Sequence, residues 1–215
     1  MDYTSLILSS ISFLVGLATI KFAKPTLLRL VIVILGITVL TETLSLKIPN
    51  NEVNNLYNIF SFFDMGIWFL VYYRIHKKEK AISWILLAEV FVLIFSLVES
   101  YYDWGHFHTW SLRLYNIVII FFSVLYLYRL LFKEYYEISK DPVFFICVAC
   151  ILYHSLSFIK FTTISEFVFF KDRNAANVFF TLDAIANILY YLFLCVAFIV
   201  SFYCQRKYLQ SYRSL

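Results

Sequence analysis

The sequence predicts an all-helical integral membrane protein with about seven transmembrane helices. Of its 215 residues, 62% are hydrophobic and only 15% are charged, whereas soluble globular proteins are close to half apolar and a quarter charged. The apolar residues form continuous runs of roughly 20, the length that an α-helix needs to cross a bilayer. A membrane β-barrel would instead show segments of about ten residues with alternating polarity.

The apolar runs place the membrane spans. We expect them at Tyr3–Lys21, Leu27–Leu46, Leu56–Tyr73, Ile82–Tyr101, Trp110–Phe132, Pro142–Ile164 and Val178–Tyr203. They take up most of the chain, so residues 1–215 are predicted to form one polytopic membrane domain without a soluble catalytic or DNA-binding domain. Pro25 and Pro142 lie at the starts of two spans, where a missing N–H does no harm. Asp141 is expected to cap the sixth helix.

The distribution of basic residues predicts the orientation. One set of span ends carries Lys21, Lys24, Arg29, Arg74, Lys77, Lys78, Lys80, Arg129, Lys133, Lys140, Arg206, Lys207 and Arg213. The opposite ends carry only Lys47, Lys171 and Arg173 in loops. Because cytoplasmic loops are rich in Lys and Arg, we expect the N-terminus outside and the C-terminus in the cytoplasm, in a bacterial inner membrane. The start Met-Asp-Tyr lacks the basic region of a cleavable signal, so the first span is expected to remain.

Charged and polar side chains within the apolar runs are the best indication of function. An ionisable group at the centre of a spanning helix costs about 2.5–3.5 kcal/mol on insertion scales, so such groups face one another, water or a ligand. Most of them fall in the outer or middle part of their spans, and Glu89 in the inner half of the fourth span is the exception. We predict an outward-facing polar and aromatic pocket, closed below by apolar side chains. Its candidate ligand-binding residues are Glu42, Asp64, Glu99, Arg113, Asn116, His154, Lys160, Asp183 and Asn187.

A weak internal repeat relates some of these residues. Leu-Tyr-Asn-Ile occurs at 56–59 and again at 114–117, and Glu42 and Glu99 precede these segments by about the same distance. Lys160 occupies a similar place in the last pair of spans. This alignment predicts one helix followed by three parallel helical hairpins, with Glu42, Glu99 and Lys160 at one depth around a common centre. The alternative explanation of these matches is chance, because the residue types involved are common in this chain.

The charged residues also have a purely structural interpretation. Arg113 can pair with Glu99 across the short fourth loop, and Lys160 can pair with Asp183. Such interhelical pairs hold membrane helices together without a ligand. Long basic side chains near helix ends also reach the membrane interface by themselves.

The remaining motifs give little indication of a redox, metal or phosphate-binding site. Cys147 and Cys150 have CxxC spacing, but on one face of a membrane helix they are expected to pack as small apolar residues. Asp103, His106 and His108 form a weak metal-binding pattern in an outer loop. The sequence has no phosphate-binding loop, nucleophile elbow or glycine-rich loop. We therefore expect no cofactor, no resident metal and no nucleic-acid partner.

Three classes of function fit this pattern. The first is a receptor or sensor module that binds a small molecule in the outward pocket and signals through a membrane partner, since its own cytoplasmic segments are short. The second is a small transporter or channel that uses intramembrane carboxylates. The third is an intramembrane enzyme acting on a lipid, with Asp64, His154 and Asp183 as acid–base groups. We favour the receptor, with membrane lipids and a small-molecule ligand as its other partners.

Overall fold

The computed structural model contains helices and no strands over the part of the chain that it describes. That part comprises residues 3–20, 26–49, 52–77, 82–102, 109–132, 137–170 and 173–213, and for residues 163–180 and 205–213 only the backbone is described. The helices are α1 (Tyr3–Thr19), α2 (Thr26–Ser45), α3 (Val53–His76), α4 (Ile82–Tyr102), α5 (Thr109–Leu131), α6 (Pro142–Phe170) and α7 (Arg173–Arg213), with a short 3₁₀ helix at Ile138–Lys140. The predicted fold class is therefore confirmed.

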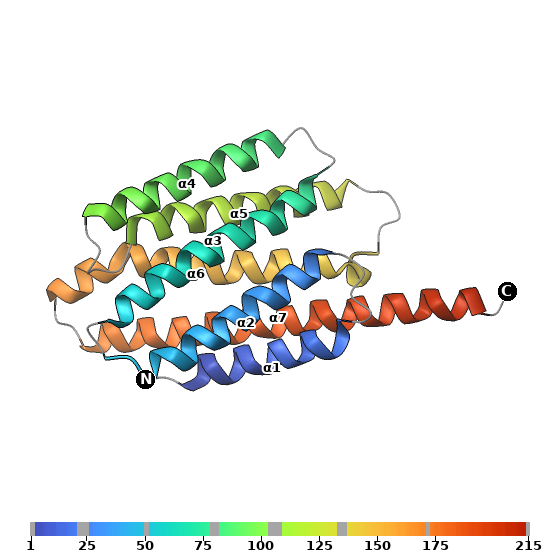
Figure 1. Ribbon diagram of the computed structural model, residues 1–215, viewed down its shortest axis with the longest axis horizontal. Helices are drawn as coiled ribbons and strands as arrows, with labels where there is room; N and C mark the ends of the chain where they lie inside the picture. The colour runs from blue at the N-terminus through green and yellow to red at the C-terminus, as the bar shows by residue number, and fades with distance from the viewer. Residues whose placement is uncertain are drawn as a thin grey trace.

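The helices run up and down along one direction, as expected for a membrane bundle. Figure 1 shows that α1 begins at one end of the bundle and that α7 ends at the other, where its last turns extend beyond the other helices. Five helices, namely α2, α4, α5, α6 and α7, contain segments long and apolar enough to span a membrane. The apolar α1 is shorter, at 17 residues. Polar residues such as Asn58 and Asp64 lower the apolarity of α3.

Six helices form a closed ring, and α4 lies outside it. Contacts between helices follow the order α1, α2, α3, α5, α6, α7 and back to α1, because α3 and α5 contact each other directly. Helix α4 packs against α3 and α5 at the edge of the bundle (Figure 1). The interior of the ring is therefore built from α1, α2, α3, α5, α6 and α7.

A stripe of small residues lets α1 pack closely into the ring. Ser9, Ser12 and Gly16 are its buried residues, and their spacing places them on one face of the helix. Small residues allow membrane helices to approach closely. The hydroxyl of Ser12 donates a hydrogen bond to the backbone carbonyl of Tyr191 at 3.2 Å, which ties α1 to α7.

The half of the bundle where α3 ends is tightly packed. Its fully buried side chains come from most of the ring helices: Leu28, Val31, Phe69, Tyr72, Ile119, Ile146, Cys147, Cys150, Leu194 and Phe198. The hydroxyls of Tyr72 and Ser123 hydrogen-bond within this core. Cys147 and Cys150 are free thiols that pack as small apolar residues, as their sequence context predicts.

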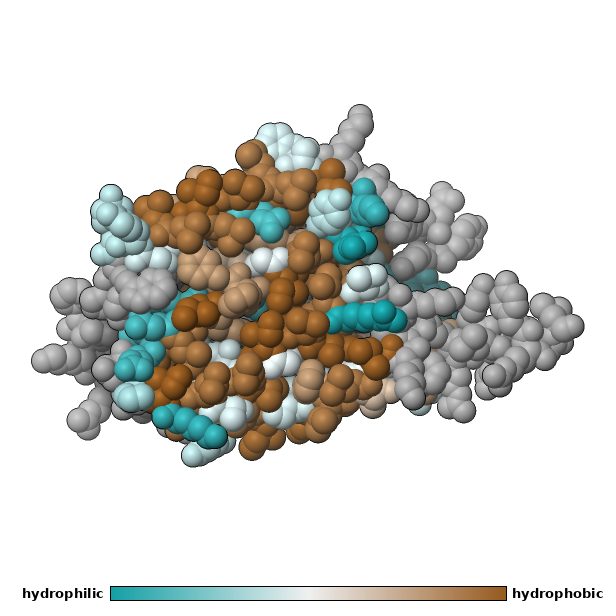
Figure 2. Space-filling view, viewed as in Figure 1, coloured by the Kyte–Doolittle hydropathy of each residue, from teal (hydrophilic) through white to brown (hydrophobic). Residues whose placement is uncertain are grey.

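The outer surface is apolar, as a lipid-facing surface must be. Figure 2 shows hydrophobic side chains over the middle of one face and most of the hydrophilic ones toward its two ends. On α4, the exposed large side chains include Trp84, Leu87, Phe91, Ile94 and Leu97. This arrangement of apolar outside and polar inside is the one expected of a bundle surrounded by lipid.

Candidate ligand-binding cavity

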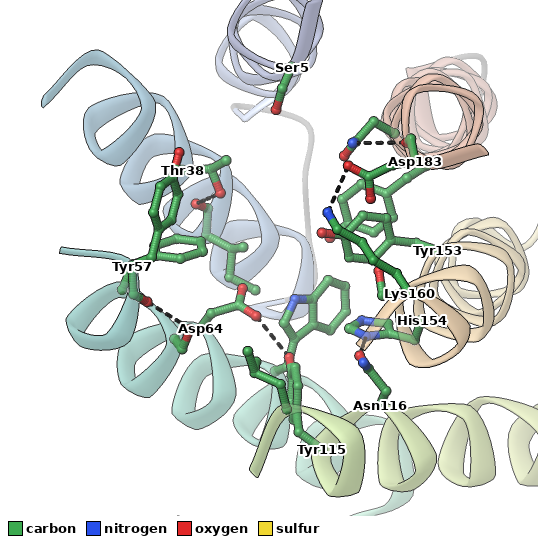
Figure 3. A pocket seen from close by; sticks show the side chains of 18 of the residues that line it. Ser5, Thr38, Tyr57, Asp64, Tyr115, Asn116, Tyr153, His154, Lys160 and Asp183 are labelled. Atoms are coloured by element: carbon green, nitrogen blue, oxygen red, sulfur yellow. Dashed lines mark hydrogen bonds and ion pairs between the residues drawn. The ribbon is translucent and has the colours of Figure 1, made fainter. Parts of the chain in front are cut away.

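A cavity of about 390 Å³ lies inside the helix ring, in the half of the bundle where α2 ends and α3 begins (Figure 3). All six ring helices contribute to its lining, and α4 contributes none of the lining residues. The polar lining residues are Ser5, Thr38, Glu42, Ser61, Asp64, Asn116, Ser157, Lys160, Asp183 and Asn187, together with His154 and several tyrosines. The volume is within the usual range for small-molecule sites.

Helical periodicity explains which residues reach the cavity. The lining residues of α2 are spaced four apart, as Ile34, Thr38 and Glu42. On the other helices the spacing is likewise three or four, for example Asp64 and Trp68 on α3. Residues spaced in this way share one face of a helix, so each helix turns one polar and aromatic stripe toward the centre of the ring.

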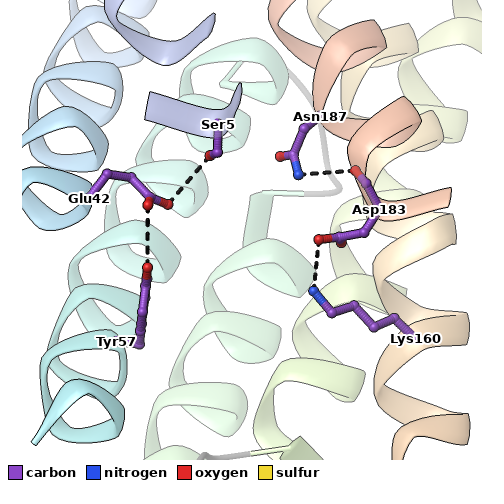
Figure 4. Close-up of polar contacts among 6 residues, drawn as sticks. All are labelled: Ser5, Glu42, Tyr57, Lys160, Asp183 and Asn187. Carbon is purple, nitrogen blue, oxygen red and sulfur yellow. Dashed lines mark hydrogen bonds and ion pairs between the residues drawn. The ribbon is translucent and has the colours of Figure 1, made fainter. Parts of the chain in front are cut away.

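Two carboxylates occupy the α2–α3 side of the cavity. Glu42 accepts hydrogen bonds from the hydroxyls of Ser5 at 3.4 Å and Tyr57 at 3.3 Å (Figure 4). Asp64 accepts a hydrogen bond from the hydroxyl of Tyr115 at 3.0 Å (Figure 3). Asp64 also accepts a hydrogen bond from the indole N–H of Trp68. The hydrogen-bond donors to both carboxylates are thus neutral groups.

The opposite side carries an ion pair. Lys160 Nζ on α6 lies 2.9 Å from Asp183 Oδ2 on α7, as the structural interpretation of the sequence predicts. Figure 4 shows this pair across the cavity from Glu42, with Asn187 beside it. The side chains of Lys160 and Asp183 retain exposures of 32% and 27%, so both remain accessible to small molecules.

The deepest polar group is a histidine–asparagine pair. His154 Nδ1 lies 2.6 Å from Asn116 Oδ1, which requires the proton on Nδ1 and leaves the lone pair on Nε2. Both residues are only 2% exposed. His154 Nε2 and Asn116 Nδ2 have no hydrogen-bond partner among the described residues. The pair therefore holds one acceptor, His154 Nε2, and one donor, Asn116 Nδ2, without partners in the described structure. Exchanging the O and N atoms of the Asn116 amide would swap which residue carries the acceptor and which the donor.

Aromatic rings surround this pair. Tyr115 and Tyr153 meet the His154 ring edge-on, with centroid distances of 5.3 and 5.2 Å. Tyr153 in turn lies 4.7 Å from the ring of Tyr190. Trp68, which is 1% exposed, lines the cavity beside the packed half of the bundle. The histidine ring is thus held in one orientation by packing as well as by its hydrogen bond.

The structure brings together seven of the nine predicted site residues: Glu42, Asp64, Asn116, His154, Lys160, Asp183 and Asn187. Glu99 and Arg113 lie outside the cavity. The Glu99 carboxylate accepts the backbone N–H groups of Trp110 at 3.1 Å and Ser111 at 2.8 Å, at the start of α5. Arg113 Nε donates to the carbonyl of Phe161 at 2.8 Å, and its guanidinium lies 4.5 Å from the ring centre of Trp110.

The sequence repeat predicted that Glu42, Glu99 and Lys160 share one centre, and the structure brings only two of them to the same cavity. The pairs α2–α3, α4–α5 and α6–α7 are each in contact, as three hairpins require. Glu42 and Lys160 line the same cavity, but Glu99 belongs to α4, which is outside the ring. Glu89 is also on α4 and does not line the cavity. The loop residues Asp103, His106 and His108 lie outside the described residues.

Several lining residues were not among the sequence candidates. Ser5, Thr38 and Ser157 are small polar residues of a kind that is common in membrane helices. Their signal was periodicity, because Thr38 precedes Glu42 by four residues and Ser157 follows His154 by three. A stripe drawn through the charged residues and His154 at helical spacing finds Thr38 and Ser157. It does not find Ser5, because α1 contains no charged residue.

Comparison with known proteins gives no family for this chain. No family model, curated protein or solved structure shows a significant match. Only the residues of the chain itself therefore indicate a function.

Proposed function

We propose that this protein is a membrane receptor or sensor module that binds a small molecule in the cavity and signals through a membrane partner. The observation that carries this proposal is the His154–Asn116 pair, whose free acceptor and donor are buried at the cavity wall. A buried polar atom without a hydrogen bond costs about 1–3 kcal/mol. A ligand with a matching donor and acceptor recovers that cost, so the pair favours bound over free ligand.

The packing of the other half of the bundle supports binding rather than conduction. Phe69, Tyr72 and Phe198 are at most 1% exposed and belong to one continuous apolar core. A transport path would have to pass through this core. The helices that line the cavity are also continuous there, whereas many transporters bind substrate at broken helices.

We further infer that the cavity opens to the outside of a bacterial inner membrane. Support comes from the basic residues, which concentrate at the end of the bundle away from the cavity. Arg74 and Lys77 lie where α3 ends, and Arg129 lies where α5 ends. By the positive-inside rule this end is cytoplasmic, so an external molecule would reach the cavity without crossing the membrane.

Native mass spectrometry of the purified protein tests ligand binding. We expect a small molecule to be retained by the wild type and lost in Asn116→Leu, which removes the donor and the partner of His154. Ser111→Ala is the matched control, because Ser111 Oγ is also buried without a partner in the described structure but lies outside the cavity. It should retain the molecule.

Two results would contradict the proposal. One is the absence of any bound molecule in both the wild type and the control. The other is equal retention in all three proteins, which would place the molecule elsewhere. Flux of the identified molecule into liposomes that depends on Asp64 would show transport instead of reception.

A further inference from the structure

The charges in the cavity are unbalanced. Among the described residues that line it, three side chains are carboxylic, those of Glu42, Asp64 and Asp183, and one carries an ammonium group, that of Lys160. Lys160 is engaged by Asp183 at 2.9 Å. The other two carboxylic side chains, those of Glu42 and Asp64, lie on the α2–α3 side, across the cavity from the ion pair (Figures 3 and 4).

Neutral donors compensate a buried carboxylate only in part. Glu42 accepts two long hydrogen bonds, of 3.4 and 3.3 Å, and the donors to Asp64 are a phenol hydroxyl and an indole N–H, both neutral. Burying a charge is unfavourable unless an opposite charge pairs with it. Glu42 and Asp64 are thus placed to bind a group that carries positive charge.

The walls between these groups suit an organic cation. The lining includes Tyr57, Phe60, Trp68, Tyr115, Tyr153 and Tyr190. Aromatic faces attract ammonium groups through their quadrupoles, and the attraction is stronger where water is excluded. The same rings also pack against the hydrocarbon part of a ligand, which a metal ion or an inorganic cation would not use.

We propose that the ligand is a small organic cation, a protonated amine bound by Glu42 and Asp64, with a hydroxyl or amide group that pairs with His154 Nε2 and Asn116 Nδ2. This proposal rests on the proposed function and adds the chemical class of the ligand. It assigns the α2–α3 side to charge recognition and the α5–α6 side to hydrogen-bond recognition. The cavity volume of about 390 Å³ is within the range of sites that bind small organic molecules.

Charge selectivity of the cavity is measurable without knowing the ligand. Thr38 lines the cavity, whereas Thr43 on the same helix is exposed outside it. Thr38→Cys and Thr43→Cys would be made in a background with Cys195→Ala and Cys204→Ala, which removes the partly exposed native thiols. Each is then modified with 2-aminoethyl or 2-sulfonatoethyl methanethiosulfonate, and the rates are followed by intact mass.

We expect the ratio of cationic to anionic reagent rates to be roughly tenfold higher at Thr38→Cys than at Thr43→Cys, given the Coulomb energy of nearby charges in a partly buried site. Glu42→Gln and Asp64→Asn should each lower this ratio. Glu52→Gln, which alters an exposed carboxylate outside the cavity, should not. Equal ratios at the two positions, or a ratio that is unchanged in Glu42→Gln and Asp64→Asn, would overturn the proposal.

Thermal unfolding with matched compounds separates this proposal from the one on which it rests. The probes are tyramine, phenethylamine and choline, with 4-hydroxyphenylacetate as the anion that shares the ring and hydroxyl of tyramine. Stabilisation by a cation, lost in Glu42→Gln or Asp64→Asn, supports the amine. Stabilisation by the anion, or by none of the cations, overturns the amine class. A different experiment tests the receptor proposal, which is contradicted if native mass spectrometry finds no bound molecule.

Discussion

Gly16 is the point where α1 lies closest to its neighbours. A Cβ atom there would be 2.8 Å from Ile32 Cγ1 and 3.2 Å from two ring atoms of Phe198. Both neighbours are nearly fully buried, so neither has room to move away freely. Gly66 on α3 is different, because a Cβ atom at that position meets nothing within 4 Å.

We predict opposite effects of alanine at these two glycines. Gly16→Ala should lower the free energy of unfolding by about 1–3 kcal/mol, the usual cost of overpacking a close-packed interior. Gly66→Ala should be neutral or stabilising by up to about 1 kcal/mol, since alanine favours the helix. Thermal unfolding in detergent measures both, and equal losses at the two positions would contradict the packing of α1.

Single residues also show where sequence reasoning succeeded and where it failed. The Lys160–Asp183 pair was anticipated because charges of opposite sign on sequential helices commonly meet. The same reasoning predicts a Glu99–Arg113 pair across the fourth loop, but the hydrogen bonds of these two side chains are to backbone groups of other segments. Backbone groups are the same in every sequence, so no pattern in the chain indicates which of them a side chain will meet.

At the scale of helices, two carboxylates cap helix starts in different ways. Asp141 precedes α6 and its Oδ1 accepts the backbone N–H of Val143 at 2.9 Å, which confirms the expected N-cap. Its other oxygen accepts the hydroxyl of Tyr126 at 2.5 Å and links α6 to α5. Glu99 caps α5 from the neighbouring helix, so a residue distant in sequence satisfies N–H groups that would otherwise lack partners.

Glu99→Leu should therefore destabilise the protein without affecting the cavity. Loss of a cap costs about 0.5–2 kcal/mol, and the negative charge near the start of α5 is lost with it. Glu99→Gln, which keeps one carbonyl acceptor, should cost less. Thermal unfolding gives the stability and native mass spectrometry gives ligand retention. Loss of the bound molecule in Glu99→Leu at temperatures where the protein is folded would contradict a purely capping role.

The helices themselves were largely predictable. Each of the seven overlaps a predicted span, because twenty apolar residues in a row have few alternatives to a spanning helix. The main difference is α7, which was expected to end at Tyr203 and continues to Arg213. Hydropathy marks where a chain leaves the apolar region, but a polar segment can continue the same helix beyond it.

At the scale of the whole molecule, the order of helices in the ring was the unpredictable part. Sequence patterns placed the charges at similar depths, but depth does not determine which helices enclose a common space. The direct contact between α3 and α5 closes the ring and excludes α4. Because of this contact, Glu99 on α4 is separated from Glu42 and Lys160, although the sequence repeat predicts a common centre for all three.

The orientation of the whole bundle is testable with fusions. A fluorescent protein that folds only in the cytoplasm should fluoresce when attached after α7, whereas alkaline phosphatase, which needs an oxidising compartment, should be inactive there. The physical reason is the concentration of Lys and Arg at that end. A phosphatase inserted at Asn51, between α2 and α3, should be active. The reverse pattern would place the cavity on the cytoplasmic side.

The position of α4 separates two sets of evolutionary constraints. The helices of the ring must preserve both their packing and the residues that face the cavity. Helix α4 supplies none of the lining, and side chains such as Trp84, Leu87 and Phe91 face outward. Its outer face can therefore diverge to suit a different lipid composition while the lining of the cavity stays the same. In relatives of this chain, sequence variation on that face should exceed variation along the cavity stripes.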